Sequence, residues 1–221
     1  AGRVEIALYN ALWHTGGTVP EMTQACERAL DCALEFKTKT LEFQARWGLC
    51  ALNVTRGAYP PALQHAQILS EYASHSTNAV TRNLSHRMLA LASHFCGAFT
   101  QARMHAEAAA DVDDAIRRNH VNAFQPDART TAVAILARTL WIQGESRLAM
   151  ATAIRCMQEA QALGHALSLC VALFWICPMA IWAGERRAAR AWVDTMLQQT
   201  RSKGFAYWHD WALCYDDAMK L

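Results

Sequence analysis

A phrase that begins with glycine recurs along this chain at a nearly constant interval, and this repeat constrains the fold more than any other feature. The phrases read GTVPEM, GAYPPA, GAFTQA, GESRLA and GERRAA, and their glycines are Gly17, Gly57, Gly97, Gly144 and Gly184. The intervals are 40, 40, 47 and 40 residues, so the period is 40 with one insertion of seven. Such a period is typical of proteins that stack copies of one small unit.

Side chains of matching size recur at fixed offsets from these glycines. The positions five and nine residues after the glycine are mostly small: Met22, Ala62, Ala102, Ala149 and Ala189, then Cys26, Ala66, Ala106, Ala153 and Val193. Small side chains let helices approach closely, so each unit is predicted to be an antiparallel helix pair. The glycine ends the first helix in a left-handed conformation. The aromatic residue two positions later, Tyr59 or Phe99, is expected to pack the corner.

Composition agrees with an all-α fold. The 221 residues are 53% hydrophobic and 18% charged, which excludes a disordered chain. Ten glycines and five prolines are too few for the many turns of a β-sandwich. The net charge of +2 lacks the excess of basic residues that nucleic-acid binding requires.

The periodicity predicts a single domain over 1–221, a right-handed α-α superhelix of five helix pairs plus a final helix. Thr18 and Glu21 form a capping-box pattern at the start of the second helix, with Pro20 in its first turn. The insertion falls at about 118–126. The expected helices are 3–15, 18–36, 40–56, 60–74, 78–96, 99–117, 127–143, 146–163, 166–183, 186–202 and 205–220.

Cysteine usage bears on the cellular compartment. The eight cysteines are scattered through apolar helical stretches without C-x-x-C pairs or zinc-site spacing, which favours free thiols and a cytoplasmic location. The uncharged stretch from Ala166 to Gly184 has nearly the length of a membrane span. Ser168 and Pro178 dilute it and charged residues follow at once, so a helix buried within the repeat is the favoured interpretation.

The repeat has the pattern of a leucine and a small residue, then G-x-[YF]-x-x-A, then a further alanine. This pattern resembles the tetratricopeptide repeat, lengthened to 40 residues. The segment from Gly97 to Gly144 and its flanks also resembles the C-terminal helical region of bacterial signal-transduction ATPase regulators, which are often fused to winged-helix DNA-binding domains. Gln125-Pro126-Asp127 departs from the Gly-x-Asp-Pro-like element usual there. The resemblance implies a cytoplasmic recognition arm of a transcriptional or signalling regulator.

No motif in the chain points to catalysis. A phosphate-binding loop and a nucleophile elbow are both absent. Asp111-Val-Asp-Asp114 matches the short acidic motif of class II terpene cyclases, but an exposed acidic turn is the favoured interpretation. The histidines lack metal-ligand spacing, and His65 and His75 are expected to face solvent. We therefore expect no enzyme activity, no cofactor and no metal.

Helical repeats of this kind present their first helices to a concave groove, where we expect a ligand or partner to bind. An aromatic wall with two arginines suits a peptide carboxylate or another anion. The alternative is that these aromatic side chains simply fill the centre of the superhelix. The inserted loop is a candidate lid over the groove through His120, Asn122 and Phe124. The candidate groove residues are Trp47, Arg87, His94, Phe95, Arg138, Trp141 and Trp182.

Two functions remain open from the sequence. The first is a non-catalytic sensor arm that binds other domains of its parent protein, a protein or peptide partner, or a small ligand. The second is a standalone adaptor that organises other proteins. Neither involves direct contact with nucleic acid or membrane. Apolar side chains at the first helix, Val4, Ile6 and Leu8, leave that end uncapped and predict docking to the parent protein or to a second copy as a homodimer.

Overall fold

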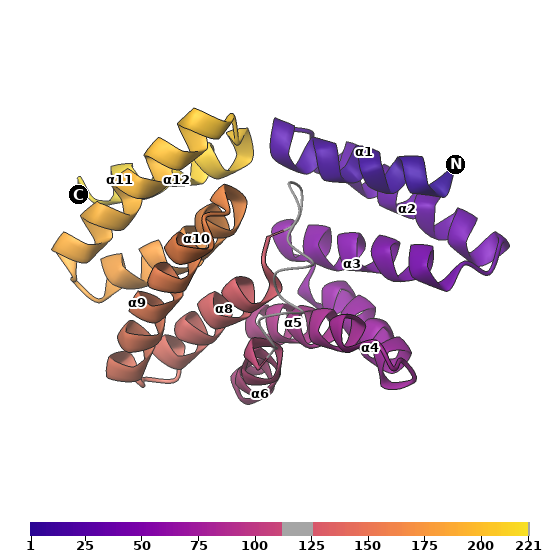
Figure 1. The fold of residues 1–221 in the computed structure, drawn as a ribbon, viewed down its shortest axis with the longest axis horizontal. Helices are drawn as coiled ribbons and strands as arrows, with labels where there is room; N and C mark the ends of the chain where they lie inside the picture. Colours follow the sequence, from indigo (N-terminus) through magenta and orange to yellow (C-terminus); the bar gives the residue numbers. More distant parts are fainter. Residues whose placement is uncertain (112–125, 221) are drawn as a thin grey trace. The chain divides into compact units, whose positions relative to one another are not determined.

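In a computed structural model, which describes residues 1–111 and 126–220, the protein consists of helices joined by short turns (Figure 1). No strand occurs in these two ranges, which confirms the all-α class. The helices are α1 (Gly2–Thr15), α2 (Val19–Glu35), α3 (Lys39–Thr55), α4 (Tyr59–Ser74), α5 (Ala79–Phe95), α6 (Phe99–Ala110), α8 (Ala128–Ile142), α9 (Ser146–Leu163), α10 (Ala166–Trp182), α11 (Arg186–Lys203) and α12 (Ala206–Ala218).

Ten of the predicted helices begin and end within two residues of the observed bounds. The exception is the helix predicted at 99–117, because α6 ends at Ala110 and Asp111 is not helical. Residues 112–117 lie outside the described residues, as does nearly all of the insertion predicted at 118–126. The right-handed superhelix of five pairs stays a prediction.

The first helices end as the repeat predicts, with one correction. Gly57, Gly97, Gly144 and Gly184 have φ between 71° and 84°, in the left-handed region. After α3, the N–H of Ala58 donates to the carbonyl of Asn53 and the N–H of Gly57 to that of Val54, the two bonds of a Schellman cap.

At the end of α1 the left-handed residue is Gly16, with φ 86°, and the prediction of Gly17 is wrong. The N–H of Gly17 donates to the carbonyl of Leu12 at 2.8 Å, a bond equivalent to that of Ala58. The first repeat is therefore one residue longer than the pattern of glycines indicates. The capping box that follows is confirmed: Thr18 Oγ1 accepts from the N–H of Glu21, and the Glu21 carboxylate accepts from the N–H of Thr18.

The described chain divides into two compact units, Ala1–His105 and Ala106–Leu221. Within the first unit, each of α1 to α4 packs against the next helix, and α3 also packs against α1 and α5. The second unit repeats this arrangement, with α10 against α8 and α12 as well as its neighbours in sequence. The prediction of one domain over 1–221 stays a prediction.

Small residues allow the helices within each unit to pack closely. In the first unit, Cys50, Ala62 and Ala66 are fully buried and pack with Leu69 and Met88 in one core cluster. The equivalent Ala149 and Ala153 of the second unit are also fully buried. Because interiors have crystal-like packing density, a larger side chain at these positions forces the helices apart.

The uncharged stretch from Ala166 forms α10, which is buried on nearly every side. Leu173, Ile176 and Met179 are fully enclosed, and Pro178 lies inside the helix. This confirms the interpretation of a buried repeat helix. Within the two described ranges, no helix combines the length and the apolar character that crossing a membrane requires.

Candidate binding site

Aromatic and arginine side chains meet where the first helices of the repeats contact one another. In the first unit, the ring centroid of Tyr9 lies 5.7 Å from that of Trp13 and 6.3 Å from that of Trp47, in edge-to-face arrangements. The guanidinium carbon of Arg87 then lies 5.2 Å from the centroid of the Trp47 ring. A continuous series of contacts therefore joins α1, α3 and α5.

Arg87 is a packing residue of this series. Arg87 is only 4% exposed, and its guanidinium contacts the face of the Trp47 ring. A desolvated cation–π contact stabilises by about 2 kcal/mol. His94 is equally buried and contacts Phe95 and Phe99 edge-on, with ring centroids 5.3 and 5.8 Å apart. Both side chains are therefore buried, and their role in a ligand-binding groove stays a prediction.

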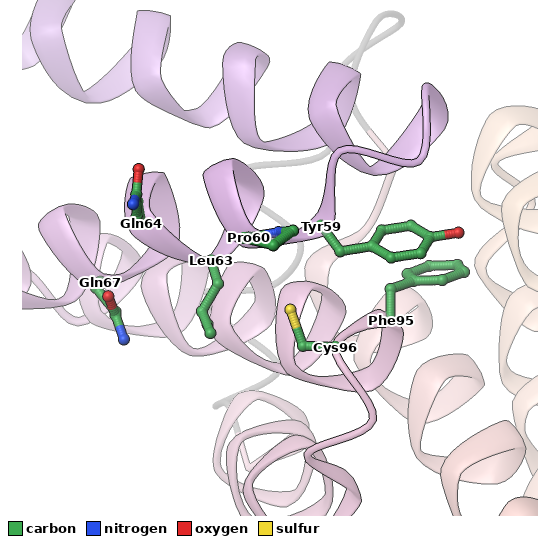
Figure 2. A pocket seen from close by; sticks show the side chains of 7 residues that line it. All are labelled: Tyr59, Pro60, Leu63, Gln64, Gln67, Phe95 and Cys96. Carbon is green, nitrogen blue, oxygen red and sulfur yellow. The ribbon is translucent and has the colours of Figure 1, made fainter.

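A pocket of about 580 Å³ opens beside Phe95, between the start of α4 and the end of α5 (Figure 2). These helix ends meet because neighbouring helices run antiparallel. The Tyr59 and Phe95 rings stack at one end of the pocket, with centroids 5.3 Å apart and planes 18° apart. Tyr59 therefore packs the corner, as the sequence predicts. The pocket is lined by Tyr59, Pro60, Leu63, Gln64, Gln67, Phe95 and Cys96.

The pocket has an aromatic end and an amide end. Gln64 and Gln67 are exposed and lie along α4, away from the stacked rings (Figure 2). Each carboxamide offers both hydrogen-bond donors and an acceptor. No charged side chain lines the pocket, and burial raises the pKa of the Cys96 thiol. The lining therefore suits recognition of a neutral apolar group flanked by amides.

The second unit holds a guanidinium between two tryptophans. The Arg138 guanidinium carbon of α8 lies 5.4 Å from the Trp175 ring centroid and 5.2 Å from that of Trp182, both on α10. Trp182 is 53% exposed, so the outer ring of this stack is open to solvent.

Next to the stack, Phe174 contacts three aromatic side chains of α12, each with a centroid distance between 5.2 and 6.4 Å. One of them, Tyr215, also donates a hydrogen bond from its hydroxyl to the Phe174 carbonyl. Trp211 is 38% exposed and extends the aromatic surface of this unit. The three residues of α12 are Trp208, Trp211 and Tyr215.

The candidate groove residues therefore fall into two sets. Trp47, Arg87, His94 and Phe95 belong to the first unit, and only Phe95 lines the pocket. In the second unit, Arg138 and Trp182 contact each other and Trp141 is half-buried at the end of α8. The candidate lid residues His120, Asn122 and Phe124 lie outside the described residues, and so does most of the acidic motif that begins at Asp111.

Sequence reasoning missed most of the pocket because it placed recognition on the first helices. The second helix α4 contributes Pro60, Leu63, Gln64 and Gln67, which follow the i, i+3, i+4, i+7 spacing of one helix face. The sequence signal that could have identified this face of α4 is the mixture of one proline, one leucine and two glutamines along it. His65, expected in solvent, is half-buried, whereas His75 is exposed as expected.

The prediction that apolar side chains of the first helix are uncovered holds for two of three residues. Val4 and Leu8 are 69% and 42% exposed, but Ile6 is buried against Ala29 and Leu41 in a core cluster of its own unit. The expectation that all three residues face a partner is wrong for Ile6, because α2 and α3 already cover it.

Most of the thiols of the chain are enclosed, whereas Cys96 and Cys214 are exposed. All eight cysteines lie in the described ranges and are free. Burial raises the pKa of Cys26, Cys50 and Cys170 to about 12, so none of these three is a thiolate at neutral pH. Among residues 1–111 and 126–220, no three histidine, cysteine or acidic side chains gather in a way that holds a metal ion.

Comparison with known proteins adds no family. No protein-family model and no curated protein sequence matches this chain.

Proposed function

We propose that this chain is a non-catalytic recognition module that binds an extended segment of a partner protein. The observation that carries the proposal is the pocket between α4 and α5, with its stacked Tyr59 and Phe95 rings and its two glutamines. Its volume of about 580 Å³ lies within the range of known ligand pockets. The repeated helices support the same conclusion, because stacked repeats form extended surfaces that bind other proteins.

The chemistry of the pocket indicates what such a segment carries. A proline or aromatic side chain stacks against Tyr59 and Phe95 at low entropic cost, because these rings already pack on each other. Main-chain N–H and C=O groups on either side pair with the carboxamides of Gln64 and Gln67. A neutral lining disfavours a highly charged ligand, since it provides no counter-charge.

The proposal is tested by selecting short random peptides on phage against the purified chain and measuring the enriched peptides by fluorescence polarisation. A Gln64→Lys/Gln67→Lys double variant removes both carboxamides from exposed positions, so folding is retained. Each lost hydrogen bond is worth about 0.5–1.5 kcal/mol. We therefore expect the Kd of pocket-binding peptides to rise about tenfold or more.

The matched control is Gln161→Lys/Gln198→Lys, which makes the same two changes at exposed positions of α9 and α11. This control keeps the wild-type affinity if the pocket is the binding site. Peptides that bind both double variants as tightly as the wild type contradict the proposal, and so does a selection that enriches none.

The resemblance to bacterial ATPase regulators extends the proposal to the role of this binding. We propose that the module acts as the cytoplasmic sensor arm of a transcriptional or signalling regulator, in which partner binding is passed to an ATPase domain. The alternative is an adaptor that only brings proteins together. A phosphate-binding loop encoded upstream in the same gene supports the sensor arm, and a gene without one supports the adaptor.

A further inference from the structure

The only pair of histidine rings in direct contact within the described ranges joins α5 to α6. The Nδ1 atoms of His86 and His105 lie 3.0 Å apart, and the ring centroids lie 5.2 Å apart with planes tilted by 33°. Both side chains are half-buried, so packing restricts their rotamers while solvent still reaches the rings. We propose that His86 and His105 chelate a divalent transition-metal ion of the zinc, nickel or copper class.

The separation of the two nitrogens suits a shared metal ion. Imidazole nitrogens bind these metals at about 2.0–2.1 Å, and two such ligands lie about 2.9 Å apart at a right angle and about 3.3 Å apart at a tetrahedral angle. The observed 3.0 Å falls between these values. In the structure the two Nδ1 atoms point toward each other at hydrogen-bonding distance. Chelation therefore requires that both rings turn, that the pair gives up its hydrogen bond, and that the tautomer changes so that both Nδ1 atoms present lone pairs to one ion.

The protonation state of the pair also favours metal binding. Burial lowers the pKa of both His86 and His105, and the pKa of His105 is lowered further by the neighbouring His86. Both rings are therefore neutral at physiological pH, which is the form that ligates metal ions. An ion that binds here displaces few protons.

The protein contributes two ligands at this site, because no larger group of metal-binding side chains occurs in the two described ranges. Water then completes the coordination, and the ion exchanges readily. His86 and His105 are 19 positions apart, which explains why no metal motif is visible in the sequence: the pair exists only because the fold brings these two side chains of α5 and α6 together.

The experiment titrates the tag-free chain with Cu²⁺, Ni²⁺ and Zn²⁺ by calorimetry and records the electron paramagnetic resonance spectrum of the Cu²⁺ complex. We expect one ion per chain, with two nitrogen ligands in the spectrum. His86→Ala and His105→Ala each leave a single imidazole, so each variant is expected to raise the Kd at least tenfold. The control His75→Ala removes an exposed histidine from the end of α4 and is expected to bind as the wild type does.

Unchanged affinity in either alanine variant overturns the proposal, and so does loss of binding in His75→Ala. Thermal unfolding in the presence of a chelator shows that each variant is folded. Added Ni²⁺ is then expected to raise the Tm of the wild type and not that of His86→Ala. The Gln64→Lys/Gln67→Lys variant is expected to retain metal binding, so the metal proposal and the peptide-binding proposal fail or succeed separately.

Discussion

At the scale of single residues, the glycines decide where each first helix stops. Gly57, Gly97, Gly144 and Gly184 adopt positive φ, and no atom lies within 4 Å of where a Cβ would stand at any of them. Glycine is therefore required by backbone conformation and not by crowding. At Gly17, by contrast, glycine is required by crowding, because a Cβ there would lie 2.5 Å from the Cβ of Leu12.

Gly97→Ala is expected to lower the free energy of unfolding by about 1–2 kcal/mol, the cost of holding an L-residue in the left-handed region. Gly97→Asn is expected to cost less, because asparagine tolerates that conformation. Urea unfolding of both variants measures the difference. A loss in Gly97→Asn as large as that in Gly97→Ala would contradict the assignment of this glycine to its φ.

The residue scale also shows where the sequence was ambiguous. Two glycines stand side by side at positions 16 and 17, and a match to the other phrases selects Gly17. The hydrogen bond from the Gly17 N–H to Leu12 makes Gly16 the left-handed residue. That bond depends on the residue at which α1 ends. The spacing of the glycine phrases does not fix this end to within one residue.

At the scale of elements, alanines at fixed offsets set the distance between helices. Ala149 and Ala153 are one turn apart on α9 and both are fully buried. Cys156 continues this face and is also fully buried, with its thiol 3.5 Å from the carbonyl oxygen of Thr130 on α8. Such a contact leaves no room for a longer side chain, which explains why the repeat is visible as small residues in register.

Ala153→Leu is expected to destabilise the protein by about 1–3 kcal/mol through overpacking, whereas Ala151→Leu on the exposed face of α9 is expected to have little effect. The two variants add the same atoms to the same helix, so helix propensity cancels. Thermal denaturation followed by circular dichroism compares them. A Tm for Ala153→Leu as high as that of Ala151→Leu would refute close packing at this position.

The elements were largely predictable and the pocket was not, for a physical reason. Helix bounds follow from local signals such as the capping box at Thr18 and the glycine at the end of α3. The pocket depends on which end of α4 meets which end of α5, and on Tyr59 stacking on Phe95 from another helix. Contacts of that kind arise from packing, so the sequence identified Phe95 and Tyr59 separately without joining them in one site.

At the scale of the whole molecule, the first unit concentrates histidines whose pKa is lowered in the folded state. Burial lowers the pKa of His86, His105 and His65, and the charges of Arg46 and Arg56 lower that of His65 further. The unfolded chain therefore takes up protons more readily below the usual histidine pKa of about 6.5. The stability of this unit is full above that pH and is lost as the pH falls toward the lowered values.

Hydrogen exchange measured by mass spectrometry at pH 7.5 and 5 tests this dependence for peptides from α4 and α5. We expect the free energy of opening in these helices to fall on acidification. In a His65→Gln/His86→Gln variant we expect a smaller fall, because fewer groups take up protons on opening. An acid-induced loss of equal size in the variant would assign the effect to other groups.

The enclosed thiols give the protein an internal set of labels. A maleimide or iodoacetamide reacts with a thiolate, and the buried cysteines form one only after their helices separate. Cys26 and Cys50 lie in the first unit, whereas Cys156, Cys170 and Cys177 lie in the second. The wild-type chain therefore reports, through the order in which its own cysteines gain mass, which half of the molecule opens first.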